Sequence, residues 1–319
     1  MSIFSISNQF QSSLLLQADR PQNKTGGIKN QYLAELSSMP RRMAAVFTHA
    51  SEQRRIELCK RRYEAWKECC PLVSNQVSLA TYANPECMFI YPGPERNPVR
   101  EQIRELAVRC PGIEVRKIRG DGHCLFRAIA AGLFIELARA PNQQRCTFFS
   151  LVESRLHQLF YSITSPEYEG AFGQKCDMFF ELARSLQNRS PEVILTNPGT
   201  SDALVSFMRS SAACCIRSTP QLQAFISGST AEYCQALERM QPAVTSIDVF
   251  NNTETVAPVQ MGDELEIRAL SLIFGINIRV INIATGNATA YTSPNPIPFP
   301  ELVLFYLPNP GHYDLACRP

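Results

Sequence analysis

A cysteine, a histidine and an aspartate stand in an order and spacing that could support nucleophilic chemistry. Cys124 follows Asp121-Gly122-His123 and opens a long apolar segment, so it would lie in the first turn of a helix. There the unpaired backbone N–H groups favour the thiolate, the reactive form of cysteine. Gly122 allows a tight turn that aims backbone amides at one point, and these amides with that of Cys124 could hold an oxyanion. The alternative is an N-cap at Asp121 followed by an ordinary buried cysteine.

A nucleophilic cysteine also needs a base and a group that orients the base. His312 and Asp314 stand two residues apart, after the turn sequence Pro308-Asn309-Pro310. Residues i and i+2 of a strand face the same side, so both side chains could enter one cleft while Tyr313 packs on the other face. The carboxylate would hold one ring nitrogen and leave the other to accept the thiol proton. Alone, a His-x-Asp sequence is uninformative, but together with a cysteine at a helix start it indicates a triad.

The segments before residue 95 predict an extension that carries no chemistry. Residues 1–40 are rich in Ser, Asn and Gln, which predicts a disordered tail. Apolar residues at helical spacing predict a helix over 41–70. The sequence YPGPERNP at 91–98 holds three prolines and a glycine, which is typical of a linker. We therefore expect a helical N-terminal extension over 41–94 and a catalytic domain over 95–319.

The catalytic domain is predicted to be mainly helical before residue 275 and mainly β after it. The apolar residues from Leu125 to Ala138 predict a helix buried at the centre of a domain. Further helices are expected over 146–241, and Asp263 with Glu266 predicts a capping box at the start of another helix, which Gly275 ends. The strands are expected at 276–283, 287–292, 301–307 and 312–317, after a short one around 113–117. This pattern predicts an α+β domain with a sheet built mainly from the C-terminal end.

The composition excludes several classes of protein. Of the 319 residues, 45% are hydrophobic, so the chain can bury a core and is not disordered throughout. A net charge of +2 predicts no strong attraction to nucleic acid or membrane, although residues 1–94 carry +4. The twelve cysteines include no CxxC and the four histidines are scattered, so we expect no metal site, no cofactor and reduced thiols. Neither a Sec-type signal nor a membrane span is predicted.

Three separate blocks of the sequence resemble the ovarian-tumour (OTU) family of cysteine deubiquitinases. Asp121–Ala128, DGHCLFRA, is similar to the cysteine box of that family. His312-Tyr313-Asp314 is similar to its terminal histidine motif. Between them, Gly262–Leu270 followed by Ile278-Arg279-Val280 resembles the helix–strand segment of family members. The blocks stand in the family order, and the resemblance covers about residues 95–319.

The resemblance implies a papain-like OTU cysteine protease fold, with the C-terminal sheet flanked by helices and a helical arm inserted after the catalytic helix. It implies that Cys124 is the nucleophile, His312 the general base and Asp314 the group that orients the base. The loop Asp121–His123 would supply oxyanion donors. The implied reaction hydrolyses the isopeptide or peptide bond after the C-terminal glycine of ubiquitin through a thioester, without cofactor or metal. The implied partners are ubiquitin, polyubiquitin chains and ubiquitinated host proteins.

Two positions depart from the family pattern, and one group of residues has two interpretations. His123 stands where Asn is more usual, and we expect a loop histidine with no catalytic part. Met261-Gly262 replaces the usual Trp-Gly, which predicts altered packing. On the arm, four aromatic residues are either contacts for ubiquitin or part of the core: Phe179, Phe180, Phe207 and Phe225.

Two other functions and two interpretations of the first residues stay open. An inactive OTU-like module would bind ubiquitin or hold a complex together without cleaving. Acyl transfer of the transglutaminase type would use the same Cys–His–Asp order, but the two-residue His–Asp spacing argues against it. The expected location is the reducing cytosol. The polar residues 1–40 would suit either an ordinary tail or the export signal of a bacterial effector delivered into a host cell without a Sec signal.

Overall fold

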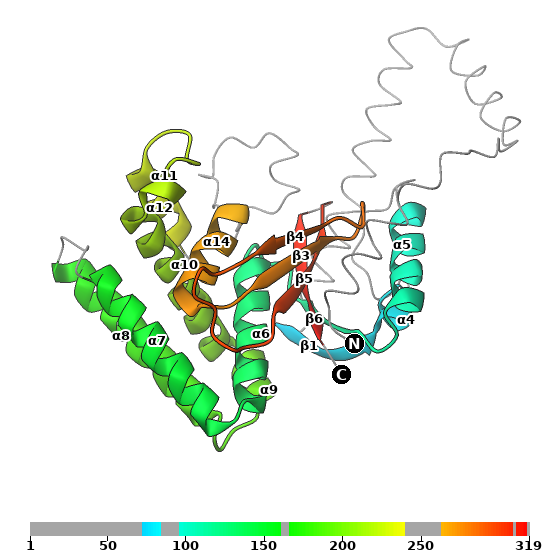
Figure 1. Ribbon diagram of the computed structural model, residues 1–319, viewed down its shortest axis with the longest axis horizontal. Helices are drawn as coiled ribbons and strands as arrows, with labels where there is room; N and C mark the ends of the chain where they lie inside the picture. Colours follow the sequence, from blue (N-terminus) through cyan, green and yellow to red (C-terminus); the bar gives the residue numbers. More distant parts are fainter. Residues whose placement is uncertain (1–71, 84–95, 161–165, 240–262, 309–310, 318–319) are drawn as a thin grey trace, which may run out of the picture. The chain divides into compact units, whose positions relative to one another are not determined.

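A six-stranded mixed sheet brings together segments that are far apart in the sequence (Figure 1). The computed structural model describes residues 72–83, 96–160, 166–239, 263–308 and 311–317. The strands are β1 (Val73–Ser78), β2 (Glu114–Ile118), β3 (Ile278–Asn282), β4 (Ala288–Tyr291), β5 (Leu302–Leu307) and β6 (His312–Cys317). Their order in the sheet is β1-β2-β6-β5-β3-β4.

The last strand in the sequence lies in the middle of the sheet. β6 pairs antiparallel with β2 on one side and with β5 on the other, with Arg116 opposite Leu315 and Phe305 opposite Asp314. β3 pairs parallel with β5 and antiparallel with β4. The ladder with β5 includes His312 and Asp314, whereas the ladder with β2 covers 315–317, and both residues are buried.

Helices cover the sheet and form a layered bundle beside it (Figure 1). In chain order they are α4 (Leu79–Tyr82), α5 (Arg96–Arg109), α6 (Cys124–Arg139), α7 (Asn142–Phe160), α8 (Pro166–Ser185), α9 (Pro191–Thr196), α10 (Pro198–Ser218), α11 (Pro220–Gln223), α12 (Thr230–Glu238) and α14 (Glu264–Phe274). Proline in the first turn starts α9, α10 and α11, where its missing N–H costs nothing. α14 begins with the predicted capping box and ends at Gly275, which has φ 64°.

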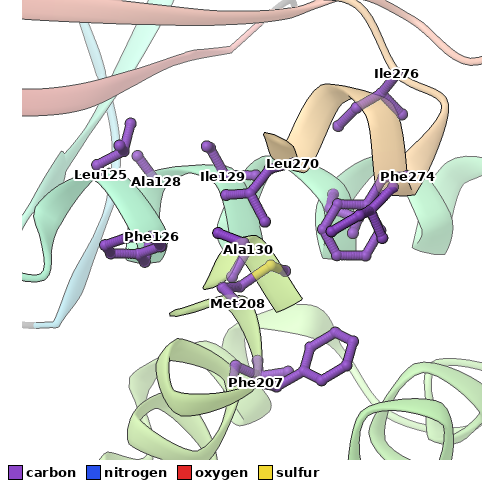
Figure 2. Close-up of a cluster of buried hydrophobic side chains, with 14 of the residues drawn as sticks. Leu125, Phe126, Ala128, Ile129, Ala130, Phe207, Met208, Leu270, Phe274 and Ile276 are labelled. Atoms are coloured by element: carbon purple, nitrogen blue, oxygen red, sulfur yellow. The ribbon is translucent and has the colours of Figure 1, made fainter. Parts of the chain in front are cut away.

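Helix α6 is the buried centre of the fold, as its apolar sequence predicts. At Gly132 the helix approaches the sheet so closely that an added Cβ would lie 3.0 Å from Leu315 Cδ1 and 3.1 Å from Leu302 Cδ2. On its other sides α6 contacts α10, and α10 also contacts α14. Figure 2 shows these helices meeting through apolar side chains, among them Ile129, Leu270 and Met208. The residue that begins α6 is therefore fixed relative to both the sheet and the helices.

The α+β architecture and the C-terminal strands are confirmed, but the expected boundary of the domain is wrong. β1 and α4 lie within the segment predicted to be a helical extension, and β1 forms a ladder with β2. The predicted linker also differs, since α5 begins at Arg96 within it. The reason is that β1 is stabilised by a partner some 40 residues away, which local sequence cannot reveal. The expected tail over 1–40 and helix over 41–70 lie outside the described residues.

The part of the chain that the structure describes holds no helix that is both long and apolar enough to span a bilayer.

Candidate active site

Cys124 lies at the first position of helix α6, directly after a tight turn. Gly122 has φ 79°, a conformation that favours glycine, and Asp121 Oδ1 accepts a hydrogen bond from the backbone N–H of His123 at 3.0 Å. The N-cap is His123, whose side chain makes no capping hydrogen bond. The alternative of an N-cap at Asp121 is therefore wrong, and the first backbone N–H groups of α6 are not capped by a side chain, as an oxyanion site requires.

The structure brings His312 and Asp314 to Cys124 from the central strand β6. His312 Nε2 lies 3.0 Å from Asp314 Oδ1, and since a carboxylate only accepts, Nε2 carries the hydrogen. The His312 side chain also makes a hydrogen bond with Cys124. Only 8% of His312 and 3% of Asp314 are exposed. The three residues predicted from spacing thus form one contiguous Cys–His–Asp cluster.

The electrostatic environment of His312 favours its protonated form. Burial is the largest influence and lowers the pKa of the imidazole. The charges of Asp314 and Cys124, together with hydrogen bonds to both, outweigh burial and hold the pKa of His312 well above its usual value. A protonated imidazole held by a carboxylate and lying beside a cysteine sulfur is the arrangement that proton transfer to a leaving group requires.

Three donors from three segments hold the Asp314 carboxylate. Oδ1 accepts from the backbone N–H of Ile118 at 2.7 Å as well as from His312, and Oδ2 accepts from the Tyr82 hydroxyl at 2.6 Å. Burial, then the charge of Asp314 and the hydrogen bond to it, raise the pKa of Tyr82 well above its usual value, so the phenol stays a neutral donor. Sequence reasoning missed Tyr82, and only the β1–β2 pairing could have placed it here.

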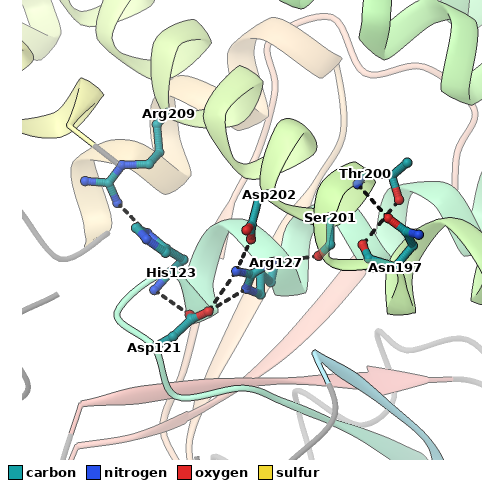
Figure 3. Close-up of polar contacts among 8 residues, drawn as sticks. All are labelled: Asp121, His123, Arg127, Asn197, Thr200, Ser201, Asp202 and Arg209. Carbon is teal, nitrogen blue, oxygen red and sulfur yellow. Dashed lines mark hydrogen bonds and ion pairs between the residues drawn. The ribbon is translucent and has the colours of Figure 1, made fainter. Parts of the chain in front are cut away.

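A buried arginine connects the loop before Cys124 to helix α10 (Figure 3). Arg127 donates to Asp121 Oδ2 from Nε at 3.0 Å and from Nη2 at 2.7 Å. It also donates to Ser201 Oγ and to Asp202 Oδ1, each at 2.6 Å. Burial lowers the pKa of Arg127, but the two carboxylates more than compensate. The conformation of the Asp121–His123 loop is therefore fixed by an ion-pair network and not by the glycine alone.

His123 is buried beside Cys124, and its ring faces the guanidinium of Arg209. Its Nδ1 lies 3.4 Å from Nη1 of Arg209, which also appears in Figure 3. Burial lowers the pKa of His123 to about 4; Asp121 opposes this effect, and the charges of Arg209 and Arg127 add to it. His123 is therefore neutral at physiological pH. Its side chain points to α10 and not to His312, which fits the expectation that it has no catalytic part.

Replacing His123 with Asn is expected to reduce the dependence of stability on pH. An unfolded histidine binds a proton below a pH of about 6.5, whereas His123 in the folded chain does so only near pH 4. The unfolded chain thus binds more protons between these values, and stability falls as the pH falls, by about 2 kcal/mol at pH 4.5. Urea unfolding gives the free energy of unfolding of both proteins at pH 7 and at pH 4.5. The decrease between these two pH values should be larger in the wild type than in the variant by this amount. Equal pH dependence in both proteins would contradict the assignment.

The other described cysteines are free, and most are chemically inert. Burial raises the pKa of Cys176 and Cys214 to about 12, and that of Cys215 and Cys234 to about 11. These thiols remain protonated at neutral pH and pack as small buried hydrophobes. Within the described ranges, no group of three or more His, Cys, Asp or Glu side chains is placed to hold a metal ion.

The four aromatic candidates on the arm divide between core and surface. Phe179 and Phe207 are fully buried and stack with ring centroids 4.3 Å apart, and Phe180 is 7% exposed. The interpretation as core residues is confirmed for these three, because the helices use them to pack against each other. Phe225 is 68% exposed, with the guanidinium of Arg268 5.8 Å from its ring centroid. It remains a candidate contact residue.

Comparisons with known proteins match most of the chain. Residues 71–318 match the family Peptidase C65 Otubain, so the match begins just before β1. The protein "Ubiquitin thioesterase otubain-like" of Caenorhabditis briggsae is 25% identical over 271 residues, which cover 81% of this chain and 85% of that protein.

Solved structures share the fold. The structure of a ceOTUB1 ubiquitin aldehyde UBC13~Ub complex has a TM-score of 0.61 and 20% identity, and covers 81% of this chain and 98% of that chain. The structure of h/ceOTUB1-ubiquitin aldehyde-UBC13~Ub has the same TM-score and identity, and covers 85% of this chain and 99% of that chain. The structural similarity to these proteins extends over the whole α+β domain.

Proposed function

Because the chain belongs to the peptidase C65 otubain family, we propose that it is a cysteine deubiquitinase that cleaves the bond after the C-terminal glycine of ubiquitin. The observation that carries this proposal is the convergence of Cys124, His312 and Asp314 in one buried cluster. The ubiquitin in the titles of the related structures supports the choice of substrate. The free thiols of the described cysteines suit a reducing compartment such as the cytosol.

The proposed reaction begins with the thiolate of Cys124. It attacks the carbonyl carbon of the ubiquitin glycine, and backbone N–H groups of the Asp121–His123 loop and of Cys124 hold the oxyanion. His312 gives its proton to the leaving lysine amine, and the C–N bond breaks. Water then attacks the thioester while His312 takes the proton back, which releases the ubiquitin carboxylate and the thiol. Asp314 holds Nε2–H of His312 throughout, so that the other ring nitrogen stays directed at the reacting atoms.

An electrophilic ubiquitin probe, ubiquitin with a C-terminal vinyl sulfone, tests the proposal. The expected result is a covalent adduct that peptide mass spectrometry locates on Cys124 and no other cysteine. Reversible binding of ubiquitin without an adduct would favour an inactive ubiquitin-binding module instead. Formation of a new amide only in the presence of added amines would favour acyl transfer. A folded chain that neither binds nor reacts would overturn the assignment of ubiquitin as the substrate.

A further inference from the structure

A tyrosine outside the triad contacts its aspartate. The hydroxyl of Tyr82 donates to Asp314 Oδ2 at 2.6 Å, and only 1% of Tyr82 is exposed. We propose that Tyr82 is a positioning residue: it fixes the carboxylate of Asp314 and thereby the imidazole of His312. This inference rests on the proposed function, because it gives a role in the same reaction to a residue that precedes the cysteine box.

The two oxygens of Asp314 are held by different parts of the chain. Oδ1 accepts hydrogen bonds from the Ile118 N–H and from His312 Nε2–H. Oδ2 accepts a hydrogen bond from the Tyr82 hydroxyl. A carboxylate turns easily about its last bond, since that torsion has broad minima. Donors on both oxygens prevent this rotation. Without the hydroxyl, the carboxylate can turn and draw the ring of His312 away from Cys124.

The position of Tyr82 is itself well determined. Ser78 caps helix α4 by accepting a hydrogen bond from the Thr81 N–H at 3.1 Å, and Leu79 is buried. The preceding strand β1 pairs with β2, the strand that ends at Ile118. Tyr82 and Ile118 thus reach Asp314 from two segments that one ladder holds together. A phenylalanine would fill the same space, so the hydrogen bond of the hydroxyl to Asp314 is the contact that tyrosine adds.

The test compares two variants that each remove one phenol hydroxyl from a buried carboxylate. Tyr82→Phe removes the donor to Asp314, and Tyr233→Phe removes the donor to Glu266, which caps helix α14 and is not part of the triad. With a fluorogenic ubiquitin C-terminal amide as substrate, Tyr82→Phe should lower kcat by about tenfold with KM unchanged, because the lost hydrogen bond was to a charged group. Tyr233→Phe should leave both constants unchanged. Equal kcat for Tyr82→Phe and the wild type would overturn the proposal.

A double-mutant cycle separates positioning from general packing. If Tyr82 acts through Asp314, Tyr82→Phe should cause no further loss of kcat in a chain that already carries Asp314→Ala. A loss of the same factor in both backgrounds would show that Tyr82 acts independently of Asp314, and would overturn the proposal. Should Tyr82→Phe not fold, Ser78→Ala loosens the cap of α4 and should lower kcat by a smaller factor, and an unchanged kcat would count against the proposal.

An assay without ubiquitin keeps this inference distinct from the proposed function. The rate at which iodoacetamide alkylates Cys124, followed by peptide mass spectrometry at pH 7, reports how well His312 supports the thiolate. Tyr82→Phe should slow this alkylation several-fold relative to the wild type and to Tyr233→Phe. If the wild type does not hydrolyse the ubiquitin amide, the proposed function fails, and the alkylation rates still decide the role of Tyr82. Equal rates in the three proteins would overturn that role.

Discussion

Replacing Cys124 with Ala is expected to abolish hydrolysis of a ubiquitin C-terminal amide, a loss of kcat of at least about four orders of magnitude. In the proposed reaction the Cys124 thiol forms the thioester, and alanine has no nucleophilic atom in its place. Alanine is a strong helix former and removes only one small buried group at the start of α6, so the fold should persist. Initial rates measured with equal concentrations of folded protein give the comparison.

Two measurements complete this prediction. The Cys124→Ala chain should still bind ubiquitin, because the substitution leaves the surrounding surface intact. Calorimetry measures this binding. Cys110→Ala is the matched control: Cys110 is also buried, and burial, partly opposed by Arg109, raises the pKa of its thiol, so its loss should not affect kcat. Hydrolysis at the wild-type rate by a chain shown to lack Cys124 would contradict the mechanism.

Replacing Arg209 with Met is expected to lower the free energy of unfolding by about 2–3 kcal/mol, because a buried carbonyl loses a hydrogen bond from a charged donor. Arg209 on α10 is fully buried, donates from Nε to the Leu237 carbonyl at 2.5 Å and lies 4.9 Å from the ring centroid of Phe126. Burial lowers its pKa to about 10 while the charges of Glu266 and Asp121 oppose this effect, so the guanidinium is charged at neutral pH. Without it, the Leu237 carbonyl would lose this donor, and the positive charge that Glu266 and Asp121 stabilise would be removed.

Urea unfolding at pH 7 measures this effect, with Arg217→Met as the control. Arg217 makes two hydrogen bonds of 2.9 Å with Glu238, but its side chain is 33% exposed, so its loss should cost only about 1 kcal/mol. Similar losses for the two variants would show that the buried hydrogen bond of Arg209 to Leu237 contributes no more than the partly exposed ion pair of Arg217. A normal stability for Arg209→Met would contradict the prediction outright.

The sequence predicts the pairing of His312 with Asp314 and the C-terminal strands because their signals are local, whereas the connection of this pair to Cys124 comes from the family resemblance. The alternation that places His312 and Asp314 on one side of a strand needs no knowledge of the rest of the chain. The same holds for the capping box at Asp263 and for the glycine that ends α14, both of which the structure confirms. These features depend on residues within a few positions of each other.

What could not be predicted depends on contacts between distant segments. The sequence of β1, VSNQVS, has few apolar residues, and only its ladder with β2 makes it a strand. The sequence therefore assigns Tyr82 to an extension, although its hydroxyl contacts Asp314. In the same way, nothing local distinguishes buried Phe207 from exposed Phe225, since helix packing alone decides which faces are covered.

The central position of β6 has a consequence for how the protein is made. Until this strand emerges from the ribosome, β1–β2 and β5–β3–β4 are separate parts of a sheet, and the edges of β2 and β5 that β6 will occupy are unpaired. His312 and Asp314 lie on that same strand. A nascent chain therefore lacks two residues of the Cys–His–Asp cluster and exposes two open strand edges until translation has passed β6. Completion of the sheet and assembly of the Cys124–His312–Asp314 cluster are then a single event.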